Sequence, residues 1–118
     1  MFWQNELKKK GQPWELAKCF DTSLPVSEFI PIEKIPDPHQ IELICRVNGE
    51  VKQQDNTSKM ITRIPEMLSY ISKYFTLEEG DLVITGTPKG VGPVKHGDKI
   101  SGEIPGIANI DFSVCQRK

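Results

Sequence analysis

Residues 82–92, with the sequence LVITGTPKGVG, combine the residue types best suited to bind an anion. An apolar run leads into three glycines, two threonines and a lysine. Glycine lets a ligand approach the backbone closely, and hydroxyl groups beside an ammonium group can pair with a carboxylate. The same composition is also typical of an ordinary surface loop that closes a strand. The spacing of a Walker phosphate loop is absent, so the segment does not indicate nucleotide binding.

A second candidate segment covers residues 11–23, with the sequence GQPWELAKCFDTS. Taken alone, Lys18 would be a surface lysine, because lysine is rarely buried, and Trp14 would be a packing residue. His39 and His96 have no partner at metal-ligand spacing and are expected on the surface. Further short motifs follow the second segment in order: PVS at 25–27, FIP at 29–31, NGE at 48–50, TSKMI at 57–61 and TLEEGD at 76–81.

Together these motifs resemble the fumarylacetoacetate hydrolase (FAH) family, over nearly the whole chain from about Gln4 to Val114. The similarity is strongest to members that act on acylpyruvates and oxaloacetate. The resemblance implies a mixed β-roll and a small-molecule 1,3-dicarbonyl acid as substrate. The implied reaction is acylpyruvate hydrolysis, oxaloacetate decarboxylation or keto–enol tautomerisation. It also implies Mg²⁺ or Mn²⁺ as cofactor, a homodimer for the complete protein, and an intracellular location in mitochondria, cytosol or both.

The resemblance assigns roles to three residues. Lys18 matches the family lysine that contacts the substrate's oxygens, so it is the candidate catalytic residue and a substrate-binding residue. Gln4 lies at the spacing of the family's substrate-binding glutamine, although the residues before it do not match. Thr87 matches the threonine of the family's Gly-Thr-Pro loop, which binds the substrate carboxylate. Lys89 lies in the same loop, and the resemblance supports it less strongly as a ligand than Thr87.

The part of the family pattern that holds the metal has no counterpart in this sequence. Family members use a Glu-x-Glu pair and a later Asp, all upstream of the segment that matches here, and no Glu-x-Glu occurs in this chain. We therefore expect residues 1–118 to form the C-terminal part of an FAH-like catalytic domain without metal ligands, and to be inactive alone. The alternatives are a non-catalytic β module that keeps the fold or the dimer surface, and a partial gene model whose true product is complete.

The surrounding pattern predicts a β-rich α+β fold with one amphipathic helix. The residues from Ile41 to Val47 alternate in polarity and lead into Asn48-Gly49, a strong hairpin signal. Apolar residues at helical spacing predict a helix over about 64–75, with Pro65 in its first turn. We expect Leu82–Thr85 to be a short buried strand. Further strands are expected at Lys99–Ile104 and over residues 108–114.

Composition narrows the function classes. The net charge is −1, so no electrostatic field draws the chain to nucleic acid or to an anionic membrane. No apolar run is long enough to span a bilayer. Three widely spaced cysteines indicate reduced thiols in an intracellular compartment rather than a disulfide framework. Lys8–Lys10 is expected in a solvated loop or at a frayed helix end.

Overall fold

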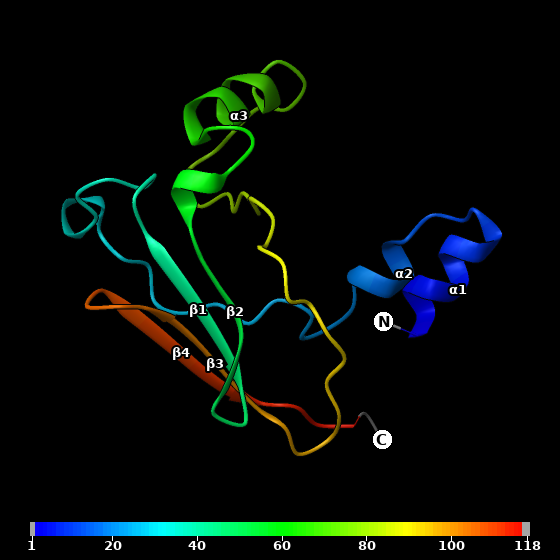
Figure 1. The fold of residues 1–118 in the computed structure, drawn as a ribbon. Coiled ribbons are helices and arrows are strands. Elements are labelled where there is room, and N and C mark those ends of the chain that lie inside the picture. Colours follow the sequence, from blue (N-terminus) through cyan, green and yellow to red (C-terminus); the bar gives the residue numbers. More distant parts are fainter. Residues whose placement is uncertain (1, 117–118) are drawn as a thin grey trace.

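The computed structural model describes residues 2–116, except the side chains of residues 2–4 and 16. Its centre is one antiparallel sheet with strand order β2-β1-β3-β4 (Figure 1). This is the β-rich α+β fold that the sequence predicts. The regular elements are α1 (Phe2–Lys10), α2 (Glu15–Lys18), β1 (Glu42–Val47), β2 (Glu50–Asn56), α3 (Ile64–Ile71), β3 (Lys99–Ile104) and β4 (Ala108–Ser113), with short 3₁₀ turns at Ile32–Lys34 and Thr57–Lys59.

The predicted hairpins are confirmed. Asn48 and Gly49 take positive φ values of 52° and 82° between β1 and β2, as a two-residue turn of this composition requires. The β3–β4 hairpin turns at residues 105–107, and β4 shows the predicted alternation of half-buried and exposed residues. β1 pairs with β3, so the two hairpins join into one sheet although about fifty residues separate them.

The two sides of the sheet differ in polarity. Residues paired directly across an antiparallel sheet share a face, so the register assigns one set of side chains to each side. One side carries polar groups, among them Arg46 and Glu103, whose side chains form an ion pair at 2.6 Å. The other side, here called the apolar face, carries Leu43, Cys45, Ile100, Ile104, Ile110 and Phe112.

The expected strand at Leu82–Thr85 is absent. This segment has no regular structure, and Leu82 and Ile84 are 51% and 71% exposed. A strand is stabilised by hydrogen bonds to a neighbour, and no strand of the described residues pairs with this segment. An apolar run alone was therefore not enough to make a strand. The alternation within β1 was also only partly correct, because Ile44 on the opposite face is more buried than Leu43.

The predicted amphipathic helix begins where expected but ends earlier. α3 starts with Pro65 in its first turn and ends at Ile71, not near residue 75. Beyond Ile71 the bonding is mixed, since the Tyr74 and Phe75 amides both donate to the Ile71 carbonyl at 3.0 Å. Bonds at three-residue spacing are common at helix ends. His39 is not a simple surface residue: its side chain is 12% exposed, and its Nε2 accepts the amide hydrogen of Ile64 at 3.2 Å.

Two short helices precede the sheet. Lys8–Lys10 forms the exposed last turn of α1, in agreement with a solvated helix end. α1 packs against α2, and Leu7 of α1 is one of the few buried apolar residues. Figure 1 shows this pair to one side of the sheet. None of the helices in the described part of the chain is long and apolar enough to cross a membrane.

A polar junction fixes the two hairpins in register. The Asn48 side chain donates to Asp98 Oδ1 at 3.0 Å and accepts from the Lys99 amide at 2.9 Å. Asp98 is only 7% exposed, and its Oδ2 accepts from the Lys95 amide at 2.9 Å. These hydrogen bonds, first that from Lys95 and then that from Asn48, lower the pKa of Asp98 below 3.8. Folding therefore favours the ionised carboxylate of Asp98.

We expect acid to weaken the fold through Asp98. A carboxyl whose pKa is lowered by folding stabilises the native state above its ordinary pKa, and this contribution is lost as the pH falls through the folded value. The thermal midpoint should therefore fall as the pH drops from about 5 to about 3. Asp98→Asn should have a lower midpoint at neutral pH and a flatter profile, because an amide nitrogen cannot accept a hydrogen bond. Asp111→Asn, which alters an exposed carboxylate, serves as the control; a profile identical for Asp98→Asn and the unmodified chain would contradict this assignment.

Candidate functional site

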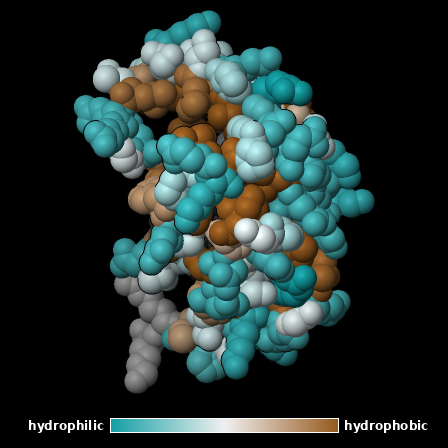
Figure 2. Space-filling view, turned by 90° about the vertical axis from the view of Figure 1, so that its left-hand side faces the viewer, coloured by the Kyte–Doolittle hydropathy of each residue, from teal (hydrophilic) through white to brown (hydrophobic). Residues whose placement is uncertain are grey.

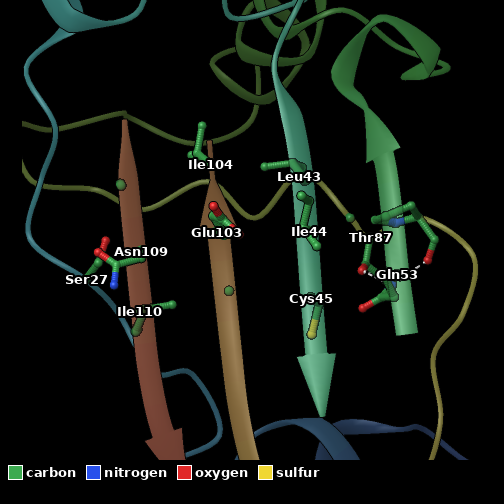
Figure 3. Close-up of a pocket in the computed structure, with 14 residues that line it drawn as sticks. Ser27, Leu43, Ile44, Cys45, Gln53, Thr87, Glu103, Ile104, Asn109 and Ile110 are labelled. Carbon is green, nitrogen blue, oxygen red and sulfur yellow. Dashed lines mark hydrogen bonds between the residues drawn. The ribbon is translucent and has the colours of Figure 1, made fainter. Parts of the chain in front are cut away.

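The glycine-rich loop is tied to strand β2 by one side chain. Gln53 Nε2 donates to Thr87 Oγ1 and to the Pro88 carbonyl, both at 2.7 Å (Figure 3). The loop also passes very close to the β2 backbone at Gly90, where φ is +107° and an added Cβ would overlap the Lys52 carbonyl. Glycine is required there for both reasons. The loop is thus held at two points although it has no regular structure.

The register explains why Gln53 can reach the loop. Gln53, Cys45, Gly102 and Ile110 are paired directly across the four strands, so they form one row on the apolar face. Gly102 contributes no side chain to this row. The loop lies beside the β2 end of the row, and a shallow space remains over the rest of it.

An open cavity of about 280 Å³ lies over this row. Figure 3 shows Thr87 and Gln53 at one end and Ser27 and Asn109 at the other, with Leu43, Ile44, Cys45 and Ile104 and the charged Glu103 between them. A small organic acid could place its carbon skeleton on such an apolar floor and its oxygens on the polar groups at the ends. The cavity is lined by Ser27, Leu43, Ile44, Cys45, Gln53, Gly86, Thr87, Pro88, Gly102, Glu103, Ile104, Ala108, Asn109 and Ile110.

A second cavity of about 400 Å³ reaches the other side of Thr87. Three more threonines, at positions 57, 62 and 85, line it together with Lys59 and Asp55. Lys59 Nζ lies 2.7 Å from Asp55 Oδ1. The hydrogen bond from Lys59 lowers the pKa of Asp55, with a second contribution from the Asn56 amide. Leu43, Gly86, Thr87 and Pro88 line both cavities, and Thr87 is the one of these four with a polar side chain.

Thr87 keeps a hydrogen to donate. A hydroxyl group has one donor and two acceptor positions, and the hydrogen bond from Gln53 uses one acceptor position. Among the hydrogen bonds of the described residues, Thr87 Oγ1 donates to none. Gln53 therefore fixes the hydroxyl oxygen and leaves its proton available for a ligand oxygen.

Lys18 lies apart from these cavities. It is exposed at the end of α2 and lines neither of the two. Its ammonium lies 5.6 Å from the centroid of the Trp14 ring, and that of Lys8 lies 4.9 Å from the same ring. Trp14, expected to be a packing residue, is 39% exposed and interacts with two cations. Gln4 belongs to α1, and its side chain lies outside the described residues.

The described residues do not supply a metal site. Nowhere in this part of the chain do three or more His, Cys, Asp or Glu side chains lie where they could hold an ion. The three cysteines are free thiols. Mg²⁺ and similar cations need several oxygen ligands at one point.

Gln53 is the site residue that the sequence did not reveal. It lies in β2, whose sequence is EVKQQDN, and nothing in that sequence separates it from Gln54. The difference comes from the register: Gln53 shares a face with Cys45, whereas the Gln54 side chain donates to Glu42 at 2.7 Å. Only the pairing of strands reveals which glutamine meets the loop.

Comparison with known proteins gives consistent results. A family model described as fumarylacetoacetate (FAA) hydrolase C-terminal matches residues 1–115. The chain is 58% identical over 111 residues to "Oxaloacetate tautomerase FAHD1, mitochondrial" of Homo sapiens, covering 94% of this chain and 50% of that protein. It is 47% identical over 116 residues to "Oxaloacetate decarboxylase, mitochondrial" of Dictyostelium discoideum, covering 98% of this chain and 53% of that protein.

A solved structure shares the fold closely. The fumarylpyruvate hydrolase of Pseudomonas aeruginosa, in complex with Mn²⁺ and pyruvate, superposes with a TM-score of 0.90 at 34% identity, over 98% of this chain and 50% of that one. The chain spans about half the length of the curated relatives it matches, and in the human relative the matched half is the C-terminal one. On these matches, the chain belongs to the fumarylacetoacetate hydrolase family.

Proposed function

We propose that this chain contributes the substrate-carboxylate site of an FAH-family enzyme acting on a 1,3-dicarbonyl acid such as oxaloacetate or an acylpyruvate. The observation that carries the proposal is the Thr87 hydroxyl, which Gln53 holds at 2.7 Å beside a cavity with an apolar floor. The names of the relatives, which include an oxaloacetate tautomerase, an oxaloacetate decarboxylase and a fumarylpyruvate hydrolase, support this substrate class.

In this proposal Thr87 binds and orients the substrate. Its hydroxyl donates to one carboxylate oxygen, and the apolar floor excludes water from the carbon skeleton. Because Gln53 restrains the hydroxyl before the substrate arrives, little side-chain freedom is lost on binding. This contact is the same in the ground state and the transition state, so it contributes affinity rather than rate.

Lys18 has the catalytic role in this proposal. Tautomerisation, decarboxylation and hydrolysis of a 1,3-dicarbonyl acid all develop negative charge on an enolate oxygen. An ammonium group placed near that oxygen lowers the barrier, because the charge is larger in the transition state than in the substrate. Gln4 would hold a carbonyl or hydroxyl oxygen of the same substrate through its amide. Family resemblance supports these two assignments.

The cofactor, the assembly and the location are also proposals. A divalent cation, Mg²⁺ or Mn²⁺, would supply further stabilisation of the enolate in the complete enzyme, and the Mn²⁺ complex of the Pseudomonas aeruginosa relative supports this. Its ligands would come from outside the 118 residues. The complete protein is proposed to be a homodimer, located in mitochondria, as the names of the human and Dictyostelium relatives suggest, or in the cytosol.

A non-catalytic role is the second candidate. It is favoured by the lack of a metal-ligand cluster in the described residues. In that case the chain would keep the FAH fold as a binding module without turnover. The two candidates differ in what Lys18 does, because a binding module has no use for a group that acts in the transition state.

The chain alone should bind Mn²⁺ only weakly. Hard cations require several oxygen ligands at one point, and no such cluster occurs among residues 2–116. Isothermal titration with MnCl₂ should show no one-to-one site of micromolar affinity. Such a site would mean that the ligands have been misplaced.

Substitution of Lys18 and Thr87 separates rate from affinity. In a fusion of the first half of the human relative to these 118 residues, Lys18→Ala should lower kcat on oxaloacetate roughly 10²- to 10³-fold. Thr87→Val keeps the side-chain shape and should chiefly raise KM. Lys89→Ala is the control and should change either constant less. Normal kinetics for Lys18→Ala in a folded, metal-loaded protein would remove the catalytic role proposed for Lys18.

The anchor of the loop can be tested in the chain as it is. Gln53→Leu removes both hydrogen bonds to the loop, so the amides of residues 86, 87, 89 and 90 should exchange hydrogen faster with solvent. Gln54→Leu is the matched control, because its amide bonds to Glu42 on the other face. Equal exchange rates for the loop in both variants would show that Gln53 does not hold it.

A further inference from the structure

His39 caps the start of helix α3 from a distant part of the chain. Its Nε2 accepts the amide hydrogen of Ile64 at 3.2 Å, across 25 positions of sequence. The first amides of a helix have no partner within it, and a side-chain oxygen of the N-cap residue often accepts from one of them. Arg63, at the N-cap position of α3, forms no such bond, and Pro65 has no amide hydrogen. The imidazole of His39 therefore takes the place of a local cap.

This contact requires a neutral imidazole. A ring nitrogen that accepts a hydrogen carries no proton of its own, so the proton of neutral His39 lies on Nδ1. A second proton can then be added only at Nε2. Two N–H groups, those of His39 and Ile64, would point at each other, and the hydrogen bond would be lost. The positive end of the α3 helix dipole also opposes the added charge.

An acidic neighbour lies at the other ring nitrogen. Asp37 Oδ1 lies 3.7 Å from His39 Nδ1 and accepts the His39 backbone amide at 2.8 Å. On the helix side the charged residues nearest to the contact in sequence are Arg63 and Glu66, and within the described part of the chain neither forms an ion pair with His39. Protonation thus removes the bond to α3 and strengthens the attraction to Asp37, because hydrogen bonds between charged groups are the stronger ones.

A helix as short as α3 depends on the contacts at its ends. It has eight residues, none of them buried, and an isolated helix of this length is marginal in water. Figure 2, whose upper end is the α3 end of Figure 1, shows hydrophobic residues at the surface there. Met67 in this helix and Thr62 just before it line the cavity of about 400 Å³ that reaches Thr87. A movement of the first turn would therefore alter this cavity.

We propose that His39 is a pH-sensitive cap, whose protonation releases the first turn of α3 and opens the cavity beside Thr87. The cap is present while the imidazole is neutral. It is lost as the pH falls from about 7.5 to about 5.5, the range in which histidine ordinarily takes up its proton. The acid effect predicted above for Asp98 lies below this range, so the two effects can be measured separately.

Nitrogen NMR of the two imidazoles tests the contact directly. At about pH 8, where histidine is ordinarily neutral, His39 should show the tautomer with its proton on Nδ1. His96 should show the opposite tautomer, with its proton on Nε2, because its Nδ1 accepts the Gln116 amide at 3.0 Å. A proton on Nε2 of neutral His39 would refute the cap.

Hydrogen exchange tests the release of α3. From about pH 7.5 to about pH 5.5 the protection of the Ile64 and Met67 amides, corrected for the intrinsic effect of pH, should fall roughly three- to tenfold, as expected for the loss of one hydrogen bond. His39→Gln offers a carbonyl acceptor that takes up no proton in this range, so its protection should stay constant. His39→Leu should show the low protection at both pH values.

His96→Gln is the matched control, because it removes the other histidine and leaves the contact to α3 in place. It should lose protection at Ile64 and Met67 with falling pH as the unmodified chain does. Either of two results would overturn the proposal: protection in the unmodified chain that does not change with pH, or a His39→Gln variant that still loses protection on acidification.

Discussion

The Asn48 side chain fixes the alignment of the two hairpins, which the pairing of β1 with β3 and the ion pair between Arg46 and Glu103 also hold together. Asn48 occupies the tight turn of the first hairpin, where its positive φ suits an asparagine. Its side chain bonds both to Asp98 and to the first amide of β3. This contact sets Val47 opposite Ile100, and every other pair between β1 and β3 follows from it. A shift of one residue would exchange the apolar and polar faces of the sheet.

The position of the candidate site follows from this junction. The chain leaves α3 and must return to the start of β3, so residues 76–98 run past the sheet instead of pairing with it. Gln53 and the close approach at Gly90 hold this connection against β2. Thr87 therefore reaches the cavity because strand register brings Gln53 to the correct face. The loop itself supplies the chemistry, and the sheet supplies the position.

Local signals in the sequence predicted local structure well. Asn48-Gly49, Pro65 and the alternation over residues 108–114 each act through the conformation of a few neighbouring residues, and each was found as expected. Contacts between distant residues were not predictable in this way. Gln53 meets Thr87 across 34 positions, and the tight end of α3 depends on bonds that no hydrophobic pattern reports. The fold class was predictable from the sequence. The role of Gln53 in holding the loop could be recognised only from the register of the paired strands.

The incorrect prediction at Leu82–Thr85 carries information of its own. In a native sequence the local pattern normally agrees with the tertiary structure. An apolar run of strand-forming residues is found where a neighbouring strand pairs with it and other side chains cover it. Here the run is present, yet Ile84 is 71% exposed. The apolar face of the sheet shows the same conflict, since its alternation is that of a covered strand but its side chains are not buried. Two independent segments thus carry patterns suited to neighbours that these 118 residues do not provide.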